Sequence, residues 1–532
     1  MRAPRVRRVL LNGVLILGAC VPATTPSTAG EPTDFVGRSP APTISVEVLP
    51  KGDRPNFVLI LVDDLDARLG TMEHMPNVQA LLVQQGLQLD GFYVTDPTCC
   101  PSRTSILRGE YTHTHQIYTS APGEGFQRFY ELDHDSSTLA TWLQAAGYQT
   151  AFYGKYLNGY PLPEDRSYVP QGWNTWYSPA RGKPYTGFDY TLNENGLLVS
   201  YGSEADDYLI DVLAAKVEDF LANPDRGEQP FFILLAPYQP HEPADPAPRH
   251  ESLFEGLAAP RTPSFNEPDV LDKPDHIKFD PVLNEARIRD LDDLYVNRLR
   301  SMQSVDEAVA RIFRALEAGG ALEDTFVIFT SDNGYHLGQH RMPAGKSTAY
   351  EEDVRVPFVI RGPGVPADRL LSGYLSGNVD IAPTIAELAG VVPPATVEGR
   401  SLVPLLSAPT NGLEWRSGFL IEYYHGAEEE AGGTHRARYA DPDGILEPPD
   451  PDWLFESLPT PAYRGLRTAQ YKYVEYAGGF RELYDLVVDP FELDNLVGRV
   501  DPALVQNLSA WLLQFATCSG ASCRIADSAS PQ

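Results

Sequence analysis

Four short apolar runs, each followed closely by polar residues, constrain the fold of this chain more than any other feature. The runs are predicted to form β-strands at residues 56–62, 150–153, 231–236 and 325–329. The polar residues that follow them are Asp63 and Asp64, Lys155, His241, and Asp332 and Asn333. Sites in open α/β sheets form beyond the carboxyl ends of the strands. If these strands are parallel neighbours, the polar residues converge on one crevice.

Helical patterns alternate with these strands, which favours crossover helices and a mainly parallel sheet. The clearest helical pattern lies before the fourth strand, where apolar residues recur at intervals of three and four. These residues are Met302, Val305, Val309, Ile312 and Leu316, and Gly319 and Gly320 end the pattern. The predicted fold is therefore α/β, with a large mixed, mainly parallel central sheet flanked by helices.

The character of the sequence changes near residue 410. Short strand-like runs cover residues 419–424, 465–476 and 482–486, and a helical segment covers residues 503–515. We therefore expect a catalytic domain at residues 54–408 and a smaller C-terminal subdomain, built on an antiparallel sheet, at residues 409–532.

The N-terminus has the pattern of a secretory signal peptide, predicted at residues 1–20. Four arginines precede an apolar run at residues 9–19, which is too short to span a bilayer. A buried N-terminal helix is the structural alternative. The run ends at Cys20 in LGAC, which resembles the lipobox of bacterial lipoproteins, in which the cysteine becomes lipidated. Residues 21–53, rich in proline, threonine and serine, are predicted to tether the folded body, so we expect a bacterial protein that is lipid-anchored at the cell surface or secreted.

The net charge of the chain is −30 at pH 7. This charge argues against an extended basic surface for nucleic acid or an anionic membrane, so neither is an expected partner. Membrane contact is expected only through the lipid anchor. An anionic ligand would have to be captured by a local cationic pocket, against the field of the whole chain.

The other four cysteines fall into two pairs. Cys518 and Cys523 could close a small disulfide loop in an oxidising compartment. Cys99 and Cys100 are adjacent, and they could be a buried or disulfide-linked pair, or could include a thiol nucleophile at a helix N-terminus. The sequence lacks C-x-x-C spacing, so a structural zinc site is not expected.

The carboxylates after the first and fourth strands suggest a metal site. Asp63, Asp64, Asp332 and Asn333 offer hard oxygen ligands, which Ca²⁺ and Mg²⁺ prefer. The structural alternatives are a solvated strand cap at the first pair and a tight turn at Asn333 and Gly334. Taken together, the two groups favour a hard divalent cation.

Several motifs, in order along the chain, resemble those of the type I sulfatases of the alkaline-phosphatase superfamily. They are C-x-P-S-R with a nearby L-x-G at residues 99–109, G-Y-x-T-x-x-x-G-K at 147–155, S-D-N-G at 331–334 and the closing segment at 482–490. The resemblance covers about residues 54–500. Within the family, the chain looks most like the N-acetylglucosamine-6-sulfatases and related arylsulfatases.

The resemblance implies a mechanism and a set of site residues. In that family a formylglycine-generating enzyme oxidises the first cysteine of the motif, here Cys99, to formylglycine (3-oxoalanine), whose hydrate is the nucleophile. The implied ligands of a Ca²⁺ ion, with Mg²⁺ as the alternative, are Asp63, Asp64, residue 99, Asp332 and Asn333. The implied catalytic residues are Cys99, Arg103, Lys155, His241 and Lys346, of which Lys155, His241 and Lys346 would also bind the substrate. The implied activity is hydrolysis of sulfate esters, of the N-acetylglucosamine-6-sulfate or aryl sulfate type.

One position departs from the family pattern. Many sulfatases carry a histidine two residues after the motif lysine, where this chain has Leu157. His113, His115 and His336 are candidates for its role in releasing sulfate, and the alternative for each is an ordinary loop histidine. Two other functions also stay open: hydrolysis of phosphate or phosphonate esters, and binding of sulfated glycans without turnover if Cys99 is unmodified.

Overall fold

The computed structural model describes residues 54–529 apart from 122, 408, 409, 411, 425–444 and 446–458. The predicted signal peptide, Cys20 and the tether lie outside the described residues. They therefore stay predictions, as does the domain boundary near residue 409.

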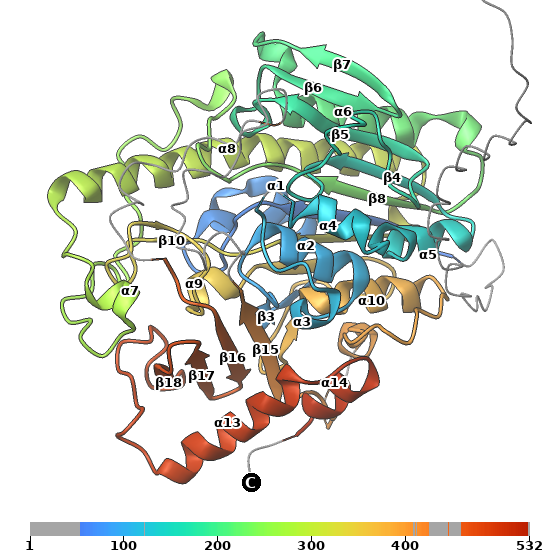
Figure 1. Cartoon of the computed structure of the whole chain (residues 1–532). Coiled ribbons are helices and arrows are strands. Elements are labelled where there is room, and N and C mark those ends of the chain that lie inside the picture. The colour runs from blue at the N-terminus through green and yellow to red at the C-terminus, as the bar shows by residue number, and fades with distance from the viewer. Residues whose placement is uncertain are drawn as a thin grey trace, which may run out of the picture. The chain divides into compact units, whose positions relative to one another are not determined.

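Ten strands of the described residues pair into one mixed sheet, in the order β13-β2-β12-β9-β1-β8-β4-β5-β6-β7 (Figure 1). Their bounds are β1 (Asn56–Val62), β2 (Leu87–Leu89), β4 (Gln149–Gly154), β5 (Thr175–Gly182), β6 (Tyr190–Glu194), β7 (Leu197–Tyr201), β8 (Phe231–Ala236), β9 (Thr325–Ser331), β12 (Phe358–Arg361) and β13 (Arg369–Leu371). The four predicted strands are β1, β4, β8 and β9, and they are parallel neighbours at the centre of the sheet. Because β6, β7 and β12 run antiparallel to their partners, the sheet is mixed, and the predicted fold class is confirmed.

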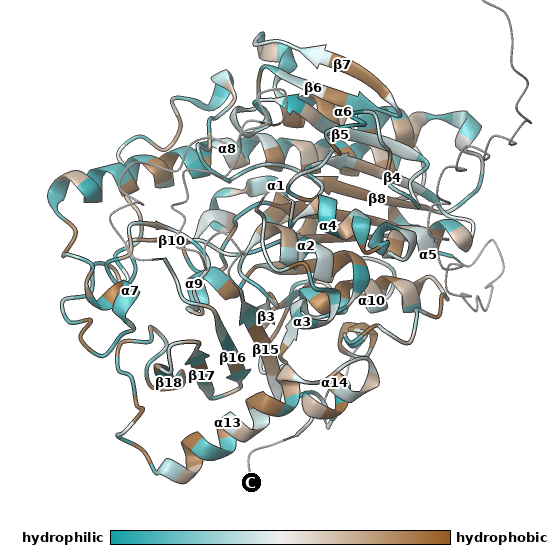
Figure 2. Ribbon diagram, in the orientation of Figure 1, coloured by the Kyte–Doolittle hydropathy of each residue, from teal (hydrophilic) through white to brown (hydrophobic). Residues whose placement is uncertain are grey.

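Successive side chains of β1 alternate between two hydrophobic cores, one on each face of the sheet. The first core includes side chains of α2 (Cys99–Arg108), α5 (Leu139–Ala145) and α10 (Ile381–Leu388). The second includes side chains of α6 (Leu209–Ala222) and α8 (Glu285–Ala318). Figure 2 shows that β8 is hydrophobic, as expected of a strand covered on both faces.

The helix predicted from the apolar residues before β9 is α8, and it is longer than the pattern that predicted it. The helix begins at Glu285, where the side-chain oxygen of Asn284 accepts hydrogen bonds from the N–H groups of Ala286 and Arg287, each at 3.0 Å. Its first turns are hydrophilic (teal in Figure 2), so they lack the apolar period of residues 302–316. The helix ends before Gly319, as predicted.

The smaller C-terminal sheet is antiparallel, as predicted, in the order β15-β16-β17-β18. Its strands and the helix that follows are β15 (Gly418–Tyr423), β16 (Tyr463–Thr468), β17 (Tyr471–Tyr476), β18 (Arg481–Asp485) and α13 (Pro502–Ala516). Phe419 of β15 and Phe515 of α13 belong to the same hydrophobic core as α2. The C-terminal sheet is thus packed directly against the layer that carries Cys99.

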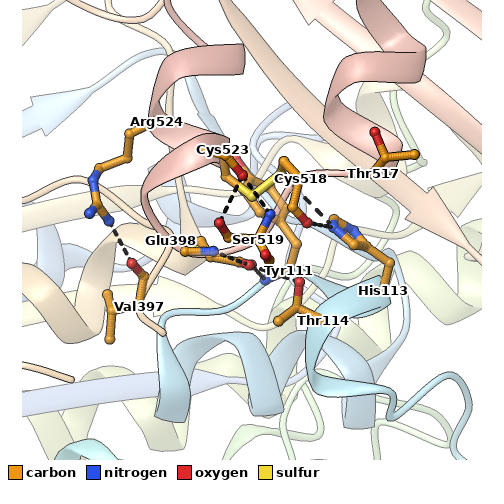
Figure 3. Close-up of a disulfide and its surroundings, with 12 residues drawn as sticks. Tyr111, His113, Thr114, Val397, Glu398, Thr517, Cys518, Ser519, Cys523 and Arg524 are labelled. Carbon is orange, nitrogen blue, oxygen red and sulfur yellow. Dashed lines mark hydrogen bonds between the residues drawn. A yellow bond between two sulfur atoms is a disulfide. The ribbon is translucent and has the colours of Figure 1, made fainter. Parts of the chain in front are cut away.

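The remaining elements are short. They are β3 (Phe92–Tyr93), β10 (His336–Leu337), β11 (Ala344–Gly345), β14 (Ser376–Gly377), α1 (Pro76–Val78), α3 (Thr112–His115), α4 (Phe126–Glu131), α7 (Asp275–Lys278), α9 (Glu351–Val354), α11 (Val403–Leu406) and α14 (Ala521–Ala526). Cys523 of α14 and Cys518, just before that helix, form a disulfide (Figure 3), which the sequence had left as a possibility. Among the described residues, no helix combines the length and apolar character needed to cross a membrane.

Candidate active site

The polar residues that follow the four central strands meet in one place, as their positions predicted. Lys155, after β4, lies with its Nζ 2.6 Å from Oδ2 of Asp63, after β1. His241, after β8, lies with its Nε2 3.6 Å from Oδ2 of Asp64. Asp332, after β9, accepts a hydrogen bond through Oδ1 from the backbone N–H of Asp64 at 3.1 Å. Parallel strands end at the same edge of the sheet, so residues far apart in sequence become neighbours.

Cys99 is the first residue of α2, and its sulfur lies among these groups. Its Sγ is 3.4 Å from Asp63 Oδ1, and it accepts a hydrogen bond from Lys346 Nζ at 2.8 Å. Burial raises the pKa of the Cys99 thiol well above its usual range, and the Asp63 carboxylate adds to this effect, so an unmodified thiol there is poorly ionised. Cys100 instead packs in the hydrophobic core, and both sulfurs are free thiols, so the two cysteines are not linked to each other.

Three buried carboxylates, those of Asp63, Asp64 and Asp332, have oxygen atoms within 4.8 Å of one another. Asn333 adds a buried amide oxygen, Oδ1, without a hydrogen-bond partner among the described residues, while its Nδ2 donates to Asp64 Oδ1 at 2.7 Å. Burial raises the pKa of Asp332 to about 6, although Arg103 opposes the shift. Clustered carboxylates and an unpaired amide oxygen are a donor set that fits a hard divalent cation such as Ca²⁺ or Mg²⁺.

Three cationic side chains, those of Arg103, Lys155 and Lys346, lie around Cys99 and the three carboxylates. Arg103, one turn along α2 from Cys99, donates from Nε to Asp332 Oδ2 at 2.7 Å and from Nη1 to the Lys155 carbonyl at 2.6 Å. Its Nη2 is buried without a hydrogen bond to the described residues. Lys346 Nζ lies 2.5 Å from Asp64 Oδ1. Burial disfavours the charged form of each group, but the neighbouring carboxylates outweigh it and raise all three pKa values. Together they form the local cluster of cations that capture of an anionic ligand needs against the net charge of −30.

His241 stands at the margin of the site with a defined tautomer. Its Nδ1 lies 2.8 Å from the backbone oxygen of Glu242, so Nδ1 carries a hydrogen and donates, and Nε2 faces the carboxylates. Burial lowers the pKa of His241 to about 4, although Asp64 opposes the shift. The ring of Tyr185 lies 4.7 Å from the His241 ring and 5.1 Å from Lys155 Nζ. Sequence reasoning missed Tyr185, because it lies in a one-turn 3-10 helix (Pro184–Thr186) with no local motif.

The histidine positions considered from the sequence lie in other environments. Leu157 is buried in the hydrophobic core. His113 Nδ1 lies 2.7 Å from a Glu422 carboxylate oxygen, and His115 Nε2 lies 3.1 Å from Ser105 Oγ. His336 Nδ1 lies 2.9 Å from an Asp353 carboxylate oxygen. Each of the three histidines is therefore engaged with a partner other than the residues around Cys99.

Comparison with known proteins identifies the family. The family model described as "Sulfatase" matches residues 55–391. The chain is 34% identical to the N-acetylglucosamine-6-sulfatase of Capra hircus over 483 residues (88% of this chain, 85% of that protein). It is 33% identical to an arylsulfatase of Volvox carteri over 512 residues (88% of this chain, 76% of that protein). A protein solved in complex with its substrate D-glucosamine-2-N,6-O-disulfate has a similar fold, with a TM-score of 0.67 and 23% identity, and the match covers 89% of this chain and 98% of that one. The chain therefore belongs to the sulfatase family and is a sulfuric ester hydrolase.

Proposed function

We propose that this enzyme hydrolyses 6-O-sulfate esters of N-acetylglucosamine through a formylglycine at position 99 and a bound Ca²⁺ ion. The observation that carries the proposal is the position of Cys99 Sγ, in contact with Asp63 and Lys346 at the edge of the central sheet. In the mature enzyme the sulfur atom would be replaced by the hydroxyl oxygens of the hydrated aldehyde. The relatives named above support the choice of a sulfated glucosamine as substrate.

The proposed chemistry needs both the formylglycine at position 99 and the bound cation. When bound, a cation held by Asp63, Asp64, Asp332 and Asn333 would supply Lewis-acid chemistry. Residue 99, as the hydrated aldehyde, would supply two hydroxyls. The oxygen of one would bond to sulfur as the bond between sulfur and the alcohol oxygen breaks, and loss of the proton from the other would restore the aldehyde as the bond to sulfate breaks. Lys155 and Lys346 would bind the sulfate oxygens.

The other side chains would orient the nucleophile and handle the proton. Arg103, already bound to Asp332, would hold the oxygens of residue 99 through Nη2, which lies 3.7 Å from Asp63 Oδ1 and makes no hydrogen bond to the described residues. His241 would deliver a proton from Nε2 to the departing alcohol, which is a poor leaving group without one. Arrival of the sulfate anion would raise the pKa of His241 from its low value and favour the protonated form.

The test is a turnover screen on purified protein whose aldehyde content has been measured by peptide mass spectrometry. N-acetylglucosamine-6-sulfate should be hydrolysed with a kcat/KM at least tenfold above those for galactose-6-sulfate, 4-nitrophenyl sulfate and a matched phosphate or phosphonate ester. Preference for the aryl sulfate would replace the substrate assignment. Preference for the phosphorus esters, or binding without turnover by protein that carries the aldehyde, would contradict the proposed function.

We also propose that the enzyme is exported and lipid-anchored through Cys20. A formylglycine-generating enzyme would oxidise Cys99 during maturation. The support is the basic N-terminus, the short apolar run and the LGAC sequence. In a bacterial host, Cys20→Ala should move the enzyme from the membrane fraction to the soluble fraction. An unchanged distribution, or a mature N-terminus without lipid, would contradict the anchor.

A further inference from the structure

Lys346 reaches the site from a loop whose own conformation needs support. Its side chain is long and flexible, so the place of the ammonium group depends on where the backbone is held. The next residue, Ser347, has a φ of 84°, in the left-handed region that costs a non-glycine residue energy. Such a conformation persists only where neighbouring groups fix it.

Asp353 of α9 provides contacts that fix this loop. Its carboxylate is fully buried, and Oδ2 accepts hydrogen bonds from the N–H of Thr348 at 2.9 Å and from Thr348 Oγ1 at 2.6 Å. Asp353 Oδ1 accepts a hydrogen bond from His336 Nδ1 at 2.9 Å. Thr348 lies two residues after Lys346, and His336 pairs with Gly345 between β10 and β11. One carboxylate therefore holds both sides of the hairpin that ends at Lys346.

The backbone of α9 also holds the segment that follows Asn333. The N–H of Gly334 donates to the carbonyl of Asp353, and the N–H of Tyr335 donates to the carbonyl of Glu352, both at 2.8 Å. A Cβ at Gly334 would lie 2.0 Å from the Glu352 carbonyl oxygen, so only glycine allows this approach. Through Glu352 and Asp353, α9 thus contacts both the segment after Asn333 and the loop that carries Lys346.

The C-terminal sheet anchors α9 in turn. The Glu351 carboxylate oxygen Oε1 lies 3.0 Å from Arg467 Nε of β16 and 3.1 Å from Lys472 Nζ of β17. The N–H of Glu351 donates to Glu492 Oε2 at 2.9 Å. All four residues are buried, and removing one partner of a buried ion pair is costly. Figure 1 shows α9 between β10 and the strands β16 and β17.

We propose that Asp353 is a positioning residue for Lys346, and that the C-terminal sheet supports the active site through α9. The inference rests on the proposed role of Lys346 in binding the sulfate group. In Asp353→Asn one carboxylate oxygen becomes an NH2 group, so the side chain can no longer accept hydrogen bonds from both His336 and Thr348, and the loop relaxes. Lys346 Nζ then leaves its contacts with Asp64 and residue 99.

The test compares Asp353→Asn with a matched control, Asp306→Asn. Asp306 is a buried carboxylate on α8 that also accepts three hydrogen bonds, from Asn77 N, Asn77 Nδ2 and Val78 N at 3.0, 2.6 and 2.8 Å, and it makes no contact with the site residues. The first readout is the rate of acetylation of Lys346 by acetic anhydride in folded protein, mapped by peptide mass spectrometry. We expect this rate to rise at least fivefold in Asp353→Asn and to stay within twofold in Asp306→Asn.

The second readout is kcat per mole of aldehyde. It should fall at least tenfold in Asp353→Asn, whereas in a Lys346→Ala background the same substitution should change kcat by less than twofold, because the two residues act as one unit. An unchanged acetylation rate at Lys346, or independent effects of the two substitutions, would overturn the proposal.

A further variant covers the case in which Asp353→Asn does not fold. If Asp353→Asn does not fold, Thr348→Val removes one of the hydrogen bonds while keeping the side-chain shape, and it should raise Lys346 acetylation about twofold. A rate equal to that of the wild type would also refute the proposal. The acetylation readout does not depend on turnover, so a failure of the proposed sulfatase substrate is distinguishable from a failure of the positioning role.

Discussion

Lys346 donates a hydrogen bond to Cys99 across 247 positions of sequence, with Nζ 2.8 Å from Sγ. Cys99 lies at the N-terminus of α2, and Lys346 lies in the loop between β11 and α9. The same ammonium group lies 2.5 Å from Asp64 Oδ1. One cation therefore contacts both the residue proposed as the nucleophile and a proposed metal ligand. Substitutions at Cys99 and at Asp64 should both change the position of the Lys346 ammonium group.

The two adjacent cysteines should respond differently to substitution. Cys99→Ser should fold but be essentially inactive, because serine is not the substrate of an enzyme that oxidises cysteine to formylglycine. Cys100→Ala should lose about 1 kcal/mol of stability, as for a small buried side chain, and keep its kcat. Peptide mass mapping should find an aldehyde at position 99 in the wild type and in Cys100→Ala. Full activity of Cys99→Ser would contradict the proposed mechanism.

The carboxylate cluster should contain calcium in the active enzyme. Asp332→Ala should lower kcat by several orders of magnitude, since Asp332 binds Arg103 and is also a proposed metal ligand. Elemental analysis should give about one calcium per chain in the wild type and less in the variant. Stoichiometric zinc in fully active protein would contradict the assignment.

Deprotonation of His113 should lower the stability of the fold at alkaline pH. Burial disfavours the charged imidazole, but Glu422 and the Cys518 carbonyl outweigh it and raise the pKa of His113 from 6.5 to about 9. A group with a raised pKa in the folded state stabilises fully below its unfolded pKa and loses that contribution as pH rises through its folded pKa. The free energy of unfolding should therefore fall by up to about 3 kcal/mol between pH 6.5 and 9.5. His113→Gln should lose this pH dependence in denaturant titrations, and an equal slope in both proteins would contradict it.

The disulfide should stabilise the turn between α13 and α14 without taking part in catalysis. Figure 3 shows Cys518 beside His113, and Glu398 accepts hydrogen bonds from the N–H groups of Tyr111 and Gly520 at 2.7 and 3.0 Å. Replacing both cysteines by alanine should cost about 2 kcal/mol, as expected for so short a loop. Chemical denaturation checks the loss, and kcat at 25 °C should be unchanged. A tenfold fall in kcat with native stability would show that the disulfide serves the site instead.

The negative charge of the whole chain should limit the use of long polyanions. A single sulfate ester on a monosaccharide carries little charge, whereas a polysulfated chain is repelled by the net charge of −30. Raising the salt concentration should therefore increase kcat/KM on polymers more than on the monosulfate, because salt screens the repulsion. A higher kcat/KM on long sulfated chains at low salt would refute this prediction.

The sequence by itself determined the central strands, the fold class and the residues that gather at the strand ends. These features are local, because strands covered on both faces are continuous apolar runs and the polar residues follow them directly. The motifs around Cys99, Lys155 and Asp332 then indicated the family. The smaller C-terminal sheet and the end of α8 before Gly319 were also predictable from short-range patterns.

Only the tertiary structure decided which distant side chains outside the motifs meet. Tyr185 lies beside His241, Asp353 holds the loop of Lys346, and Glu422 pairs with His113, although none of these residues lies in a recognisable motif. Leu157 could not be interpreted from the sequence, and the structure buries it in the core. Such contacts depend on loop paths and on how the C-terminal sheet packs against α9. Many long-range contacts together determine those loop paths, so a short stretch of sequence cannot predict them.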